Sequence, residues 1–88
     1  MIEREVQIVN KLGLHARPAA EIVKTAARFQ SNITLIRDDL EVNGKSIMGV
    51  MMLAAEFGST IILRADGPDE GEAVEALAAL VASKFRER

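Results

Sequence analysis

The spacing of apolar side chains changes along the chain, and its first part predicts one strand followed by one helix. Near the N-terminus Ile2, Val6 and Ile8 stand at every second position among polar residues, and only Arg4 interrupts the alternation. A period of two is typical of a half-buried strand. Directly after Pro18, which suits the first turn of a helix, apolar residues recur with helical spacing. This stripe consists of Ala19, Ile22, Val23 and Ala26.

Three further strands are predicted by runs of β-branched and aliphatic residues. Residues 33–36 and 60–65 are rich in isoleucine, leucine and threonine. Asp38 and Asp39 can turn the chain, so that residues 40–42 return as a short strand beside the first of these runs.

Two more helices are predicted from capping and turn signals. Asn43-Gly44 is a tight-turn signal, after which Ser46 can cap a short apolar helix over residues 47–53. A last helix follows residues 67–69 and has acidic side chains in its first turn, where the helix dipole favours them. Its apolar stripe consists of Val74, Leu77, Ala78, Val81 and Phe85.

The predicted element order is β-α-β-β-α-β-α. This order predicts an α+β fold, an open-faced β-sandwich in which three helices cover one face of a four-stranded antiparallel sheet. The chain has 88 residues, of which 49% are hydrophobic, so one compact core is feasible. No linker, repeat or low-complexity tract interrupts it, and we expect a single domain over residues 1–88.

Composition excludes several classes of function. The chain has no cysteine and only one histidine, so we expect no disulfide, no metal site and no cofactor. The N-terminal residues lack the basic and apolar regions of a signal peptide, and no apolar stretch approaches the length that spans a membrane. We therefore expect a cytoplasmic protein without membrane insertion. The net charge of −2 and the absence of Trp and Tyr argue against nucleic-acid binding.

The segment from Leu14 to Ala20 carries the candidate chemistry. His15 follows a glycine loop and lies close to the N-cap of the first predicted helix. The first amides of that helix, at Ala16 and Arg17, lack helical acceptors, and a helix N-terminus favours an anion and disfavours an imidazolium. Arg17 adds a fork of donors suited to phosphate oxygens. A nucleophile, an anion site and a counter-charge can thus come from one turn, although a lone histidine at a helix start is also a common surface residue.

Two motifs resemble the HPr family, the histidine-containing phosphocarriers of the bacterial sugar phosphotransferase system. Residues 13–19 read Gly-Leu-His-Ala-Arg-Pro-Ala and resemble the active-site signature of that family. Residues 43–51 read Asn-Gly-Lys-Ser-Ile-Met-Gly-Val-Met and resemble its regulatory serine segment. The length and the element order agree as well, so the resemblance covers essentially the whole chain.

The resemblance implies a carrier and not a self-sufficient enzyme. His15 would accept a phosphoryl group on Nδ1 from enzyme I and pass it to IIA domains of sugar permeases, and Arg17 would stabilise the phosphate. Ser46 would be the site of regulatory phosphorylation by an HPr kinase/phosphorylase, and the phosphorylated form can serve a transcriptional regulator in some members. Read from the residues alone, Ser46 is an ordinary N-cap.

The resemblance also implies a partner-binding surface on a protein that we expect to be a monomer. Exposed apolar methionines adapt to several partners, and lysines at the rim steer acidic ones. Each methionine alone could equally be core, and we expect some of Ile47, Met48, Met51 and Met52 on the short helix to be core. The implied surface residues are Ala16, Ala20, Lys24, Lys45, Ile47, Met48 and Met51.

Other interpretations remain open from the sequence. A small-ligand-binding regulatory domain can share the β-α-β-β-α-β order but would not need His15 and Arg17 at a helix start. An RNA-binding sandwich would need aromatic residues on its sheet, which are missing here. Within the HPr family, the sequence leaves open the sugar-transport branch and the nitrogen-linked branch.

Overall fold

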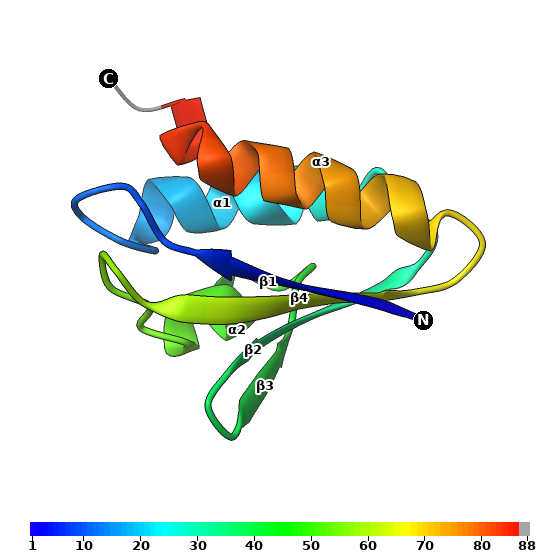
Figure 1. The fold of residues 1–88 in the computed structure, drawn as a ribbon, viewed down its shortest axis with the longest axis horizontal. Helices are drawn as coiled ribbons and strands as arrows, with labels where there is room; N and C mark the ends of the chain where they lie inside the picture. The colour runs from blue at the N-terminus through cyan, green and yellow to red at the C-terminus, as the bar shows by residue number, and fades with distance from the viewer. Residues whose placement is uncertain (87–88) are drawn as a thin grey trace.

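The chain folds into a sheet with helices packed on it, as described by a computed structural model of residues 1–86 (Figure 1). The last two residues of the predicted domain, 87 and 88, lie outside the described residues. The elements follow the predicted order, with a final 3-10 turn. Their bounds are β1 Ile2–Gln7, α1 Ala16–Ala26, β2 Asn32–Arg37, β3 Leu40–Asn43, α2 Ile47–Met52, β4 Thr60–Asp66, α3 Glu70–Ala82 and the turn Lys84–Arg86.

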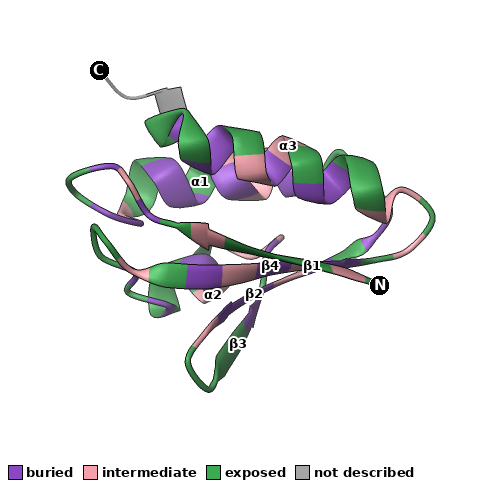
Figure 2. Cartoon of the chain, viewed as in Figure 1, coloured by how far each residue is buried: buried purple, intermediate pink, exposed green. Residues whose placement is uncertain are grey.

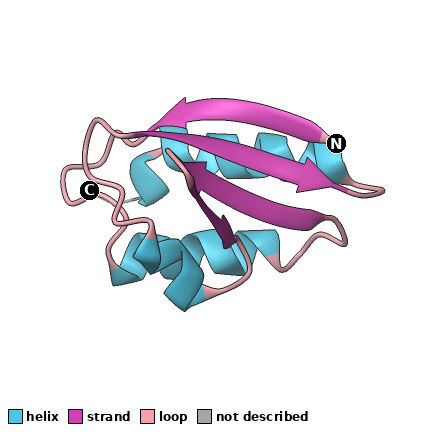
Figure 3. Ribbon diagram, turned by 90° about the horizontal axis from the view of Figure 1, so that it is seen from below, coloured by secondary structure: helices cyan, strands magenta, loops and turns pink. Residues whose placement is uncertain are grey.

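The four strands form one antiparallel sheet in the order β1-β4-β2-β3. The last strand in sequence therefore lies in the middle, between the first strand and the β2–β3 hairpin. Helices α1 and α3 lie beside each other over the sheet, and α2 contacts α1 and β3 (Figures 1 and 3). The predicted open-faced sandwich is confirmed.

The alternation along β4 shows how the sheet separates its two faces. Ile61, Leu63 and Ala65 are buried against the helices, whereas Ile62 and Arg64 lie on the open face. Figure 2 shows the buried positions concentrated between the helices and the sheet. The core draws on every layer of the fold. Its largest fully buried members are Ile8, Ile22, Leu35, Ile61, Leu63, Leu77, Val50, Val74 and Val81.

Arg4 interrupts the alternation of β1 because it pairs with a helix. It shares the face of Ile2 and Val6, which are half-buried and pack against the core. Its guanidinium forms an ion pair with Glu75 of α3. An edge strand can accommodate such a side chain, because its outer side remains in contact with water.

The sequence extends the last helix too far, because Phe85, the last residue of its predicted stripe, lies beyond the end of the helix. α3 ends at Ala82, and Lys84 and Phe85 have positive φ angles of 58° and 57°. Phe85 is nevertheless 3% exposed and belongs to the core. The assignment of Phe85 to the core is confirmed, whereas its assignment to the helix is wrong, because the chain turns back to bring the ring inward.

Candidate functional site

The loop before α1 is held tightly against the loop that follows α2. Gly13 has a φ of +66°, and a Cβ at this position would lie 2.4 Å from the carbonyl oxygen of Ala55. The next amide, that of Leu14, donates to the same oxygen at 2.9 Å. Only glycine permits this approach, because any side chain would push the two loops apart. The glycine loop before His15 is therefore in a defined position.

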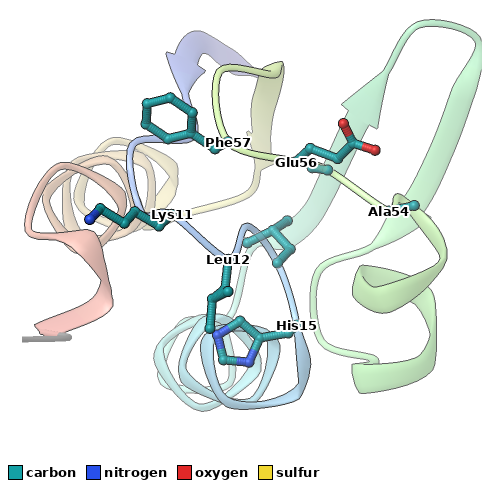
Figure 4. Close-up of a pocket in the computed structure, with 8 residues that line it drawn as sticks. Lys11, Leu12, His15, Ala54, Glu56 and Phe57 are labelled. Atoms are coloured by element: carbon teal, nitrogen blue, oxygen red, sulfur yellow. The ribbon is translucent and has the colours of Figure 1, made fainter.

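His15 is the N-cap residue of α1. Its backbone is extended, and its carbonyl oxygen accepts the first helical hydrogen bond, from the amide of Ala19, at 3.0 Å. Its side chain makes no capping bond to the helix. The half-buried imidazole instead lines an open depression of about 600 Å³ between the two loops. In Figure 4 the side chain of Leu12 extends toward the ring, whereas Lys11 points away from it.

The first turn of α1 follows His15 directly and carries groups of positive character. Ala16 and Arg17 are exposed, and their amides have no acceptor within the helix because the first helical bond begins at Ala19. Pro18 has no N–H group. The first turn contains no acidic residue. The structure thus brings His15, Ala16 and Arg17 together at the N-terminus of α1. No acidic side chain of the first turn offsets the positive end of this helix dipole.

Ser46 is the N-cap of α2, as predicted. Its Oγ accepts a hydrogen bond from the amide of Gly49 at 3.1 Å. The hydroxyl is half-buried. The capping role is therefore confirmed, whereas the regulatory role implied by the resemblance stays a prediction.

The predicted apolar surface is present on α2 and is larger than expected. Ile47, Met48 and Met51 are 45%, 77% and 43% exposed, and Met52 is 65% exposed. The expectation that some of these four side chains are core is wrong. Val50 is the buried residue of this helix, because a helix of six residues at the periphery can turn only a narrow face inward.

The two lysines of the predicted rim differ. Lys24 is exposed on α1. Lys45 is half-buried, and its ammonium donates to the carbonyl oxygen of Phe29 at 2.7 Å. Lys45 therefore contributes a positive charge and also links the start of α2 to the chain just after α1. Ala20 is exposed one turn beyond Ala16 on α1.

Three residues near His15 were not singled out from the sequence. Leu12 and Phe57 line the depression and are 73% and 63% exposed. Asn10 is 2% exposed, and its Nδ2 donates to the carbonyl oxygen of Gly13 at 2.8 Å. An apolar residue in a glycine loop was a signal for Leu12, whereas the burial of Asn10 depends on distant segments.

Within residues 1–86, no three His, Cys, Asp or Glu side chains converge in a way that could hold a metal ion. Over the same residues, no helix combines the length and the apolar character needed to cross a membrane.

Comparison with known proteins identifies the family. Residues 2–83 match the model of the PTS HPr family, described as "PTS HPr component phosphorylation site". Phosphocarrier protein HPr of Cupriavidus necator is 53% identical over 87 residues, which are 99% of this chain and 98% of that protein. A crystal structure of HPr from Thermoanaerobacter tengcongensis is 50% identical with a TM-score of 0.96, and the match covers 100% of this chain and 99% of that one.

A paralogous branch of the family is also similar. A crystal structure of Crh from Bacillus subtilis, a dimer with a swapped domain, is 48% identical with a TM-score of 0.77. The match covers 96% of this chain and 97% of that one. Our expectation of a monomer remains a prediction beside this dimeric relative. The full-length similarity in sequence and fold leaves one assignment: this chain belongs to the HPr family of phosphocarrier proteins of the phosphotransferase system.

Proposed function

We propose that the chain accepts a phosphoryl group on His15 from phospho-enzyme I and passes it to IIA domains. The observation that carries this proposal is the place of His15, between an open depression and the N-terminus of α1. A partner's reactive group can enter the depression, and the phosphoryl group then lies beside donors that favour an anion. The sugar-transport and the regulatory pathways use the same step.

The transfer itself is a displacement at phosphorus. The lone pair of Nδ1 of His15 attacks, and a new N–P bond forms while the bond between phosphorus and its carrier atom on enzyme I breaks. That carrier atom keeps the electron pair. The onward transfer to a IIA domain repeats the step in reverse order, with the imidazole of His15 as the leaving group. The chain supplies nucleophile and orientation, whereas its partners supply donor and acceptor, and the chain is accordingly a carrier.

The helix and Arg17 stabilise the charge that is transferred. Phosphoryl transfer depends largely on positioning and on electrostatic stabilisation of the equatorial oxygens. The amides of Ala16 and Arg17 are available as donors because helix geometry gives them no acceptor. The guanidinium of Arg17 is exposed on the same turn and can form a paired hydrogen bond with two phosphate oxygens.

The docking surface consists of the exposed apolar side of α2 and the first two turns of α1. Ile47, Met48 and Met51 supply its apolar area, and Ala16 and Ala20 allow close approach. Lys24 and Lys45 border it with positive charge, which suits acidic partner surfaces. The protein acts in the cytoplasm as a monomer in this proposal.

Ser46 regulates the same surface when it is phosphorylated by an HPr kinase/phosphorylase. Its hydroxyl lies at the start of α2, directly before Ile47 and Met48. A phosphate adds about −1.5 to −2 charges there and repels an acidic enzyme I surface. The phosphorylated form can also present a new face to a transcriptional regulator.

The test is the intact mass of the protein after incubation with phosphoenolpyruvate and enzyme I. We expect one added phosphate at neutral pH, its loss after acid treatment, and no addition to a His15→Ala variant that retains the wild-type circular dichroism spectrum. An acid-labile phosphate on His15→Ala would contradict the assignment of the site. No added mass on the wild type, with an enzyme I that phosphorylates another HPr, would contradict the function.

A further inference from the structure

We propose that Asn10 is a positioning residue that holds His15 in place for phosphoryl acceptance. This inference rests on the proposed function of His15. Asn10 touches neither the depression nor the phosphate site, and it acts through the backbone of the loop. The side chain is 2% exposed and is one of two polar side chains buried in the described part of the chain, the other being Ser31.

The carbonyl oxygen of Gly13 is the link between Asn10 and His15. It accepts one hydrogen bond from Nδ2 of Asn10 at 2.8 Å and another from the amide of His15 at 3.0 Å. The amide of Gly13 in turn donates to the carbonyl oxygen of Asn10 at 3.1 Å. The loop is therefore closed in both directions, and the backbone of His15 is bonded to the same oxygen that Asn10 holds.

The rest of the loop leaves little freedom once this oxygen is held. Gly13 lies against residue 55 so closely that a Cβ on it would be 2.4 Å from the Ala55 oxygen, and the amide of Leu14 donates to that oxygen at 2.9 Å. On the other side, the carbonyl oxygen of His15 is bound to the amide of Ala19. The amide of His15 is held as well, and its acceptor is oriented by Asn10.

The hydrogen bonding of Asn10 indicates that its donor is what the site uses. Its Oδ1 is buried and has no hydrogen-bond partner within residues 1–86. A buried polar atom without a partner is unfavourable, and an apolar side chain of the same size would avoid that cost. Stability alone therefore does not account for an amide at this position, whereas a donor aimed at the Gly13 oxygen does.

Two substitutions separate positioning from stability. Asn10→Ala removes the donor and leaves a cavity, and Asn10→Leu removes the donor and the unpaired oxygen while it keeps the branching of the side chain. Ser31→Ala is the matched control, because Ser31 is 1% exposed and its Oγ donates to Asp69 at the opposite end of the fold. We measure kcat and KM for acceptance from phospho-enzyme I, together with the thermal unfolding temperature.

We expect both Asn10 variants to lower kcat by about tenfold or more with little change in KM, because small displacements of a reacting group cost rate. Ser31→Ala lowers the unfolding temperature but leaves kcat unchanged. Should Asn10→Ala fail to fold, Asn10→Leu still decides. An unchanged kcat in Asn10→Leu, or an equal loss in Ser31→Ala, would overturn the proposal.

Hydrogen exchange of the His15 amide tests the same proposal without any partner. We expect exchange of this amide to be faster by up to about tenfold in Asn10→Leu, since one hydrogen bond of ordinary strength is weakened, and unchanged in Ser31→Ala. Unchanged exchange in Asn10→Leu would contradict the positioning role even if the wild type accepts phosphate. Faster exchange would show that Asn10 holds the backbone of His15 whether or not the wild type accepts phosphate, so failure of the positioning role and failure of the proposed function can be told apart.

Discussion

The N-termini of α1 and α3 lie at opposite ends of the molecule and are satisfied in opposite ways (Figure 1). The first turn of α3 contains Glu70 and Glu72, and its N-cap Asp69 accepts hydrogen bonds from Gln30 and Ser31. The first turn of α1 contains no acid. Its charged residue is Arg17. A helix N-terminus attracts negative charge. Of these two helices, only α3 has acidic side chains in its own first turn.

The contrast shows how one fold keeps a structural end and a reactive end apart. At α3, hydrogen bonds from Ser31 and from the amide of Gln30 hold the pKa of Asp69 below its ordinary value. The amide of Gly67 and the N-terminal amine do the same for the pKa of Glu70. Asp69 joins the start of α3 to the segment after α1, and Glu70 joins it to the N-terminal amine of the chain. At α1 no acidic side chain belongs to the first turn, and the proposed function places the transferred phosphoryl group there.

Making the start of α1 resemble the start of α3 has the largest expected effect. Arg17→Glu removes the guanidinium and places a negative charge at the positive end of the helix dipole. We therefore expect the rate of phosphate acceptance to fall by about a hundredfold. Initial rates with phospho-enzyme I measure this. Arg28→Glu makes the same change of charge beyond the other end of α1 and is the matched control. Equal rates for the two variants would show that the charge at the start of α1 is unimportant.

A negative charge on the start of α2 has a smaller expected effect. Ser46→Asp should lower kcat/KM for acceptance by about tenfold, mainly through KM, because it repels an acidic partner without touching His15. Ser46→Asn provides the control, since asparagine caps a helix as well as aspartate does but carries no charge. If both variants retain the wild-type rate, Ser46 is only a cap.

Substitutions at the α3 end should affect stability and leave transfer unchanged. Because the pKa values of Asp69 and Glu70 are lowered in the fold, their stabilisation is fully present above the ordinary carboxyl pKa of about 4 and is lost as the pH falls through the lowered values. We expect the unfolding temperature to drop below about pH 5 and Asp69→Asn to weaken this dependence. A lower transfer rate in Asp69→Asn at neutral pH would break the separation of the two ends.

The sequence predicted the features that depend on near neighbours. The period of two in β1 and the helical spacing after Pro18 each reflect one face of a single element. The cap of α2 by Ser46 is also local, because its partner Gly49 is three residues away. The motif around His15 was readable for the same reason, because a loop, a nucleophile and a helix start follow one another within a few residues.

Contacts between distant segments were decided by the tertiary structure alone. The pairing of Arg4 with Glu75 and the bonds of Asp69 to Ser31 join residues whose separation in the chain carries no periodic signal. Phe85 did follow the period of the last helix, but its positive φ and the turn that brings its ring inward were not predictable from that period. The burial of Asn10 belongs to the same group, although its partner Gly13 is only three residues away. Local spacing specifies which face of an element is apolar and which residue begins a helix. Only the packing of separate segments determines which polar side chain becomes buried and which carbonyl oxygen it can reach.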